Sequence, residues 1–151
     1  PLGIINKYNG IKDQQIINNS LKLLDKIGPD YWCGYSYAWE ANMKARAGDG
    51  DGAAKALEVF SKAFCSTNSF HLNGDQTKTG LSKFQYRPFT LEGNFAFAAG
   101  LQEMLIQSHD DIIDILPAIP SSWKNVSFEN LRTEIPEDVQ YDRENVEGYT
   151  R

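Results

Sequence analysis

The sequence lacks an excess of basic residues, a long apolar run and a recognisable leader. Fifteen lysines and arginines face 20 acidic residues, giving a net charge of −5. This charge argues against a nucleic-acid-binding protein, which needs a basic face to neutralise phosphates. No apolar run approaches the roughly 20 residues that a membrane-spanning helix requires. The opening Pro1-Leu2-Gly3-Ile4 has neither a charged n-region nor an initiating methionine, so we expect a processed or excised chain.

Cysteine and histidine are scarce, and their spacing does not fit a metal centre. Cys33 and Cys65 lie among apolar and aromatic residues, which favours buried thiols over a disulfide or a metal pair. His71 and His109 stand alone, without zinc spacing. The turn at residues 49–52, DGDG, is similar to the start of a calcium loop but lacks the further ligands and the closing glutamate. We therefore predict a solvated turn and helix N-cap there, and no metal or cofactor.

The composition is that of an ordinary globular domain with many aromatic residues. The 151 residues are 41% hydrophobic and 23% charged, enough for one domain with one core. Three tryptophans and seven tyrosines contribute to an aromatic content of 12%. Aromatic side chains often line sugar or ligand sites, but they also fill cores, so both interpretations stay open.

Apolar periodicity predicts a mainly helical protein. Helical spacing recurs in four segments, at residues 11–27, 36–47, 53–65 and 95–108. Gly28-Pro29 ends the first segment, and the short Gly/Asp turn between the second and third indicates an antiparallel helical hairpin. Alternation then predicts two strands, at residues 112–116 and 126–131.

Two regions show no lasting period. Residues 66–91 are polar, and an ordered loop of this length in a compact domain is often functional. Part of this loop is expected to pair as a short hairpin around Asn73-Gly74. From Glu134 onward the chain is acidic and poor in apolar residues, which predicts an extension outside the core.

One stretch places a carboxylate at a loop–helix junction. Residues 87–95, RPFTLEGNF, bring Glu92 between a proline-restricted approach and the start of an apolar helical pattern. A negative charge is electrostatically favoured near a helix N-terminus, and loops held by rigid elements often carry chemistry. From spacing alone, Glu92 and Asn94 either start a helix or belong to a site.

Four stretches of the sequence are similar to motifs of one known family. They are residues 34–39 (GYSYAW) with 45–51, residues 87–95, residues 103–108, and residues 116–120 with Trp123 and Leu131-Arg132. In this order and spacing they resemble the C-terminal part of the glycoside hydrolase family 95 catalytic domain, the family of inverting α-L-fucosidases and related α-L-galactosidases. The resemblance covers residues 31–132, and residues 1–30 share it less distinctively.

The resemblance implies a fold and a set of partners. The family's catalytic domain is an (α/α)6 barrel followed by a small β domain. This chain would supply the last helical hairpins of the barrel in residues 1–110, a few short β-strands in residues 111–133 and an acidic tail in residues 134–151. The implied partner is a carbohydrate, an oligosaccharide or polysaccharide glycan. Protein partners would be the upstream part of the same enzyme or a second copy, and the parent enzyme is expected to be secreted or periplasmic.

The resemblance also implies a role for Glu92. Inverting hydrolysis uses a general acid on one face of the sugar and a base-activated water on the other. Glu92 matches the position of the family's base-side aspartate, and Thr90 stands where the family has glutamine. Residues with a predicted part in substrate binding are Arg87, Asn94, His71, Gln76 and Trp32. The general acid lies upstream in the family, so we expect this chain to be inactive alone.

Three alternatives remain open at this stage. Trp39 lies inside a helical segment beside Ala38, which favours a core position over a sugar platform. Arg87 pairs with Glu92 or a substrate hydroxyl, or else is a surface residue. The chain as a whole is either a hydrolase fragment or a non-catalytic helical module that binds carbohydrate or protein, and exposed helix faces would favour association between copies.

Overall fold

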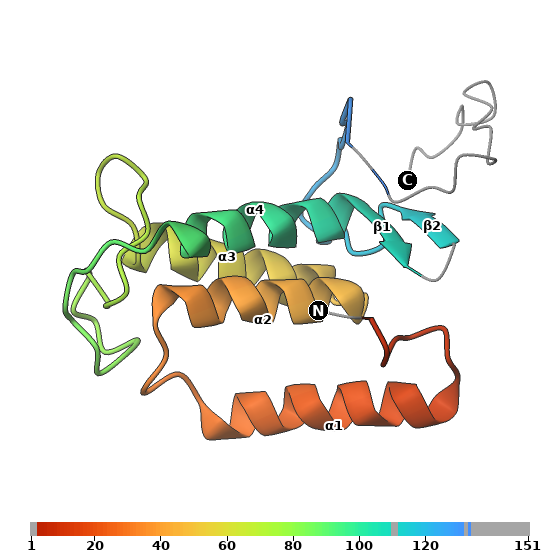
Figure 1. Cartoon of the computed structure of the whole chain (residues 1–151), viewed down its shortest axis with the longest axis horizontal. Coiled ribbons are helices and arrows are strands. Elements are labelled where there is room, and N and C mark those ends of the chain that lie inside the picture. The colour runs from red at the N-terminus through yellow and green to blue at the C-terminus, as the bar shows by residue number, and fades with distance from the viewer. Residues whose placement is uncertain (1–2, 110–111, 132, 134–151) are drawn as a thin grey trace.

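The computed structural model describes residues 3–109, 112–131 and 133. The described chain is mainly helical, as predicted. Its helices are α1 (Ile11–Ile27), α2 (Gly34–Arg46), α3 (Gly50–Ala63) and α4 (Leu91–Leu105). Two short antiparallel strands follow, β1 (Ile106–His109) and β2 (Ile112–Ile115), with Ile106 opposite Ile115. Figure 1 shows α2, α3 and α4 side by side, and α1 on one side of them.

Small side chains allow α2, α3 and α4 to pack closely. Ala41 and Ala45 of α2, Ala53 and Ala56 of α3 and Met104 of α4 form one buried cluster. Gly100 of α4 lies where a Cβ atom would meet Asn42 Nδ2 at 3.1 Å and Ala41 Cβ at 3.4 Å. The absence of a side chain there lets α4 approach α2, and small residues at such a crossing keep the packing dense.

A second buried cluster is aromatic and lies toward the loops. It contains Tyr37, Ala38, Phe60, Ala63 and Phe64. The Tyr37 and Phe64 rings are 5.1 Å apart, and Phe60 lies 5.2 Å from Phe97 of α4. Burial raises the pKa of Tyr37 to about 12, helped by the negative charges of Glu40 and Asp75. Tyr37 is therefore a neutral core residue at any ordinary pH.

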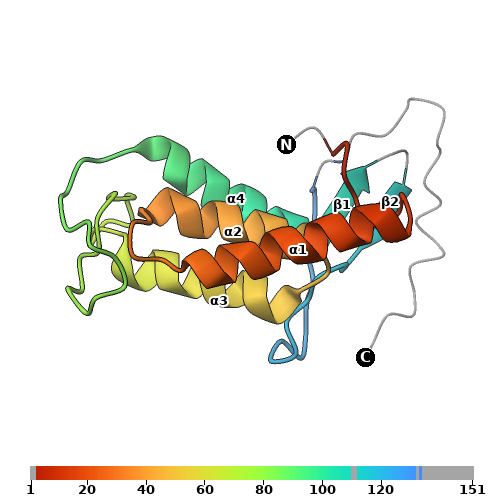
Figure 2. The same ribbon diagram turned by 90° about the horizontal axis from the view of Figure 1, so that it is seen from below.

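Helix α1 has no buried residue, unlike the other three helices. Its exposed apolar side chains are Ile11, Ile16, Leu23 and Ile27. Figure 2 shows α1 lying across one side of the α2–α4 layer. Lys44 of α2 forms an ion pair with Asp25 of α1 at 3.8 Å. α1 is thus attached to the molecule by its half-buried side and by this ion pair.

Helix boundaries follow local capping more closely than periodicity. α1 has the predicted bounds, ended by Gly28 at φ 72°. α3 begins three residues before the prediction because Asp49 Oδ1 accepts a hydrogen bond from Gly52 N at 2.8 Å. The DGDG segment is therefore a helix N-cap, as expected. α4 begins at Leu91 instead of Phe95 and ends at Leu105, so the predicted helical end at 106–108 was wrong. Residues 106–108 instead belong to β1, which pairs with β2.

The long loop pairs differently from the prediction. Asn73 N donates to Pro88 O at 3.2 Å, Gly74 N to Tyr86 O at 3.0 Å, and Asp75 N to Phe84 O at 2.7 Å. Asn73-Gly74 thus lies opposite residues 86–88 in these backbone hydrogen bonds and not at the turn of a hairpin. Gly74 is required because a Cβ would overlap the Tyr86 backbone.

Other expectations need correction or fall outside the described residues. The predicted strand at 126–131 is absent, because no partner segment pairs with this stretch in the described part of the chain. Trp39 is 47% exposed and is not a core residue, since it lies on the side of α2 away from the aromatic cluster. Both thiols are free and only half-buried. The acidic tail predicted at 134–151 lies outside the described residues.

Candidate functional site

Glu92 is the second residue of α4 and is exposed to solvent. Among the described residues it forms no ion pair, and its negative charge acts on the nearby imidazole of His71. The positive end of the helix dipole stabilises a carboxylate in this first turn. Glu92 therefore presents a carboxylate to solvent at the start of α4 without using it in an ion pair among the described residues.

Asn94 ties the first turn of α4 to the polar loop. His71 N donates to Asn94 Oδ1 at 2.8 Å, and Asn94 Nδ2 donates to Ser69 O at 2.8 Å. Both ends of this amide are used on the loop backbone. Asn94 consequently fixes the orientation of the helical turn that carries Glu92.

His71 forms the buried centre of the same region, with 0% exposure. Its ring stacks on Phe60 at 5.1 Å with an interplanar angle of 15°. A carbonyl oxygen can only accept, so His71 Nδ1 donates to Thr90 O at 2.9 Å. Thr90 Oγ1 donates to Asn73 Oδ1 at 3.0 Å and lies 2.7 Å from the same His71 nitrogen. The proton is therefore on Nδ1, and Nε2 carries the lone pair.

Burial keeps this imidazole neutral. It lowers the pKa of His71, against the hydrogen bond to Thr90 and the charge of Glu92, which raise it. His71 Nε2 is buried without a hydrogen-bond partner in the described part of the chain. A Cβ on Gly34 or on Gly93 would overlap the His71 ring. Because these two residues are glycines, the start of α2 and the first turn of α4 can both pack against the His71 ring.

The remaining predicted site residues lie on the loops at this end of the molecule. Arg87 is exposed on the extended segment before α4. Gln76 is half-buried, and its Nε2 donates to Gly74 O at 2.7 Å. Trp32 is half-buried against Tyr37, with ring centroids 5.2 Å apart. The structure thus brings His71 and Asn94 together beside Glu92, while Gln76 and Trp32 make their contacts elsewhere in the loops.

The loops are joined to one another by backbone contacts. Gly34 N donates to Asn73 O at 3.1 Å, and Lys83 N donates to Asp30 O at 2.7 Å. Ser82 Oγ donates to Trp32 O at 2.6 Å. Figure 1 shows the loop after α3 and the α1–α2 connection at the same end of the helices. The surroundings of Glu92 are therefore organised although they contain little regular structure.

Asp75 is a second carboxylate in the loop, but it cannot act as a general acid. Burial works to raise its pKa, yet hydrogen bonds from Thr77, Leu81 and Lys78 outweigh burial and lower it. Asp75 Oδ1 accepts from Thr77 N at 2.9 Å and from Thr77 Oγ1 at 2.6 Å. A general acid needs a raised pKa to hold its proton at neutral pH. Asp75 is instead an ionised acceptor that shapes the loop.

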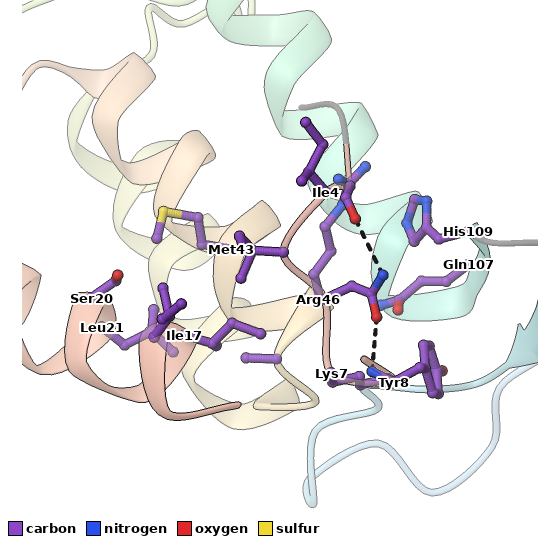
Figure 3. Close-up of a pocket in the computed structure, with 15 residues that line it drawn as sticks. Ile4, Lys7, Tyr8, Ile17, Ser20, Leu21, Met43, Arg46, Gln107 and His109 are labelled. Atoms are coloured by element: carbon purple, nitrogen blue, oxygen red, sulfur yellow. Dashed lines mark hydrogen bonds between the residues drawn. The ribbon is translucent and has the colours of Figure 1, made fainter. Parts of the chain in front are cut away.

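A cavity of about 430 Å³ lies at the opposite end of α4 and is lined by none of the predicted site residues. Because α4 has 15 residues, its two ends are about 22 Å apart at 1.5 Å per residue. Figure 3 shows Ile17 and Leu21 of α1 facing Met43 of α2, with Arg46, Gln107 and His109 across the cavity. The lining is mainly apolar on the α1 side.

The polar residues that line this cavity make contacts that hold α2 and α4 together. Arg46 Nη2 contacts Glu103 Oε1 at 2.9 Å, and His109 Nε2 lies 3.1 Å from Glu103 Oε2. Gln107 is buried and donates to Ala45 O at 2.9 Å and to Glu103 O at 2.8 Å. These contacts join the end of α2 to the end of α4. The sequence offered no signal for them, since Arg46 and Glu103 are 57 residues apart.

Two further searches concern the described residues. No group of three or more histidines, cysteines, aspartates and glutamates is arranged there to hold a metal ion. None of the described helices combines the length and the apolar character needed to cross a bilayer.

Comparison with known proteins places the chain in a class. Residues 4–105 match the model of the glycosyl hydrolase family 95 catalytic domain, and the chain belongs to this family. The match contains all four helices and the turn that carries Glu92. It confirms the family that the sequence motifs predicted.

One curated protein shows sequence similarity to this chain. The chain is similar to alpha-L-fucosidase 2 of Arabidopsis thaliana, with 28% identity over 117 residues. The aligned region covers 77% of this chain but 13% of the relative. This chain therefore spans only a small part of the length of the curated relative that it matches.

Proposed function

We propose that the chain forms the last helices of the catalytic domain of an inverting glycoside hydrolase acting on α-L-fucosyl or related glycosides. Glu92 is its base-side carboxylate. Membership of family 95 and the similarity to a plant α-L-fucosidase support the reaction class. The observation that carries the residue assignment is the exposed, unpaired Glu92 in the first turn of α4.

The surroundings of Glu92 fit such a role. A base that activates water must be ionised and held still, because a displacement of about 1 Å can lower the rate about a hundredfold. Asn94 fixes the turn that carries Glu92 through hydrogen bonds of 2.8 Å at both ends of its amide. The Glu92 side chain is one methylene longer than the aspartate that the family has at this position. Thr90 stands where the family has a glutamine, and its hydroxyl lies 2.7 Å from His71 Nδ1.

The predicted binding residues divide into two groups in this proposal. Arg87 and Trp32 contact the substrate, since Arg87 is exposed and Trp32 is half-exposed. Asn94, His71 and Gln76 support the loop, because their polar groups are already used within the chain. This division refines the expectation that all five bind the sugar directly.

The chain carries one half of a two-carboxylate reaction. The general acid must stand on the other face of the sugar, with the two carboxyl groups roughly 6.5–9.5 Å apart in inverting enzymes. Asp75 does not fit that role, because it is buried and its carboxylate accepts hydrogen bonds from Thr77 and Leu81. The acid is therefore contributed by the part of the enzyme upstream of these residues, and this chain alone hydrolyses nothing.

The proposal includes the layout of the parent domain. Residues 1–110 supply closing helical hairpins of an (α/α)6 barrel, and residues 111–133 begin a β region. The family match ends at residue 105, the last residue of α4, and β1 and β2 follow directly. In this layout the exposed apolar side of α1 packs against upstream helices.

The test combines the chain with its missing half. The purified chain and the chain co-expressed with an upstream family 95 segment that carries the acid are assayed on 4-nitrophenyl α-L-fucoside. We expect no release from the chain alone and release from the combination. Glu92→Gln should then lower the rate at least a hundredfold, while Glu92→Asp, which restores the family's residue, should retain more activity. Release by the chain alone, or an unaffected Glu92→Gln combination, would contradict the proposal.

A second candidate function has one observation in its favour. α1 leaves Ile11, Leu23 and Ile27 largely exposed, and apolar patches of this kind mark association sites. A non-catalytic helical module that pairs with a second copy would cover them. Analytical ultracentrifugation separates the two ideas: a stable dimer that binds no sugar favours the module, and a monomer that joins the upstream segment favours the enzyme.

A further inference from the structure

Two phenylalanines next to the candidate site form an exposed stacked pair. Phe70 and Phe89 have ring centroids 4.9 Å apart and an interplanar angle of 28°. Their exposed fractions are 48% and 49%. The pair therefore presents a continuous apolar surface to solvent, whereas the other stacked pair among the described residues, Phe60 on His71, is buried.

Backbone pairing holds this pair in place. Leu72 and Phe89 form an antiparallel bridge, as do Cys65 and His71. Ser66 N donates to Phe70 O at 2.9 Å. Both phenylalanines thus belong to paired backbone, so their rings occupy defined positions and are suited to shape recognition.

The pair borders the turn that carries Glu92. Ser69 and His71, the neighbours of Phe70, are both hydrogen-bonded to Asn94 of α4. Phe89 precedes the helix cap Thr90. Arg87 lies two residues before Phe89 in an extended segment, so the two side chains leave the same side of the backbone. Arg87, the phenylalanine pair and Glu92 therefore belong to one loop–helix junction.

We propose that the Phe70–Phe89 pair is a specificity subsite that receives the C6 methyl group of a 6-deoxy sugar, L-fucose, while Arg87 faces its hydroxyls and Glu92 its anomeric carbon. The inference rests on the proposed function and deepens it. L-fucose and L-galactose differ only at C6, a methyl group in one and a hydroxymethyl group in the other. The pair offers no donor or acceptor to a C6 hydroxyl, so galactose would bury that hydroxyl unpaired.

The other exposed aromatic residues do not meet these conditions. Tyr86 is 50% exposed, but it alternates to the opposite side of the extended segment from Arg87 and Phe89. Its ring packs edge-on against Phe84 at 5.6 Å. Tyr86 is thus a matched control: an aromatic residue of equal exposure in the same segment that does not face the subsite.

The experiment uses the purified 151-residue chain. Binding of methyl α-L-fucoside and methyl α-L-galactoside is followed by Trp fluorescence and by saturation-transfer NMR. We expect the fucoside to bind about tenfold to a hundredfold more tightly, and its C6 methyl protons to receive the strongest saturation. Phe89→Ala and Phe70→Ala should remove this preference, Phe89→Leu should retain part of it, and Tyr86→Ala should leave it unchanged. Circular dichroism confirms that each variant is folded.

The outcomes separate the two levels of the argument. If both glycosides bind equally and only Glu92→Gln or Arg87→Ala weakens binding, the subsite is overturned and the proposed function stands. If neither glycoside binds, the sugar site itself is overturned and the subsite with it. If Phe89→Ala leaves sugar binding unchanged but lowers the mass of an assembly in sedimentation, the pair is a contact between copies and the inference is wrong.

Discussion

The first turn of α4 leaves its carboxylate unpaired, whereas the last turn of the same helix pairs its carboxylate twice. Glu92 is exposed beside a network that fixes the backbone around it. Glu103 contacts both Arg46 at 2.9 Å and His109 at 3.1 Å. The difference teaches that the carboxylate of the last turn joins two helices, while the turn that carries the exposed carboxylate is anchored by neutral hydrogen bonds of Asn94.

The largest expected effect is at the first turn, through its packing. Gly93→Ala places a Cβ into the His71 ring, so we expect a loss of about 2–3 kcal/mol in the free energy of unfolding, measured in urea. Gly100→Ala is the control on the same helix. Its Cβ would lie 3.1 Å from a side-chain nitrogen, and the gain of about 1 kcal/mol in helix propensity offsets the crowding. An equal loss of unfolding free energy in Gly93→Ala and Gly100→Ala would show that His71 is not tightly packed against α4.

At the last turn, Glu103→Gln should destabilise by about 1–3 kcal/mol. The substitution removes a charged acceptor and leaves the half-buried Arg46 without a counter-charge. Urea unfolding measures the loss. If Glu103→Gln proves neutral, the last turn is not locked by charge and the contrast between the two ends of α4 disappears.

Acidification should destabilise the folded chain through His71, which packs against the first turn of α4. Burial lowers its folded pKa, so the unfolded chain binds a proton first as pH falls below about 6.5. Stability is then complete above that pH and declines as pH falls from there toward the lowered folded pKa. Unfolding free energies between pH 7 and 5 measure the decline, and NMR titration of the imidazole reads the pKa directly. A pKa above the ordinary value would contradict the buried neutral ring.

The smallest expected effect on stability is that of Glu92→Gln, the matched partner of Glu103→Gln on the same helix. The substitution removes the interaction with the helix dipole, worth less than about 1 kcal/mol at an exposed position, and the interaction with His71 adds little while that imidazole is neutral. Urea unfolding should therefore separate the two substitutions clearly. A loss at Glu92 as large as that at Glu103 would show that Glu92 is a structural residue.

Much of the fold was predictable because its signals are local. Gly28-Pro29 and the apolar period set the bounds of α1. The 49–52 turn was expected to hold a helix N-cap, although the helix itself was predicted to begin at residue 53 and begins at Gly50. The start of α4 was misplaced because Gly93 reads as part of a turn. Its real requirement is the His71 ring, 22 residues away, and such a long-range contact leaves no mark in a local pattern.

The candidate site was predictable only in part for the same reason. The motif around Glu92 identified the carboxylate, but the Asn94–His71 hydrogen bond joins residues 23 apart. The ring stack of Phe70 on Phe89 depends on two separate backbone bridges. Side-chain alternation predicted a strand at 126–131 that does not form, since alternation describes a face and does not supply a partner.

The weak attachment of α1 has a consequence for how the molecule opens. A helix of 17 residues without a buried side chain gains little from tertiary packing, and an isolated helix of this length is marginal in water. Its amide hydrogens should exchange with solvent through a sub-global opening while α2, α3 and α4 stay closed. The chain then has two free energies of opening, and a slow-exchanging unit begins at Gly34, the residue packed against His71.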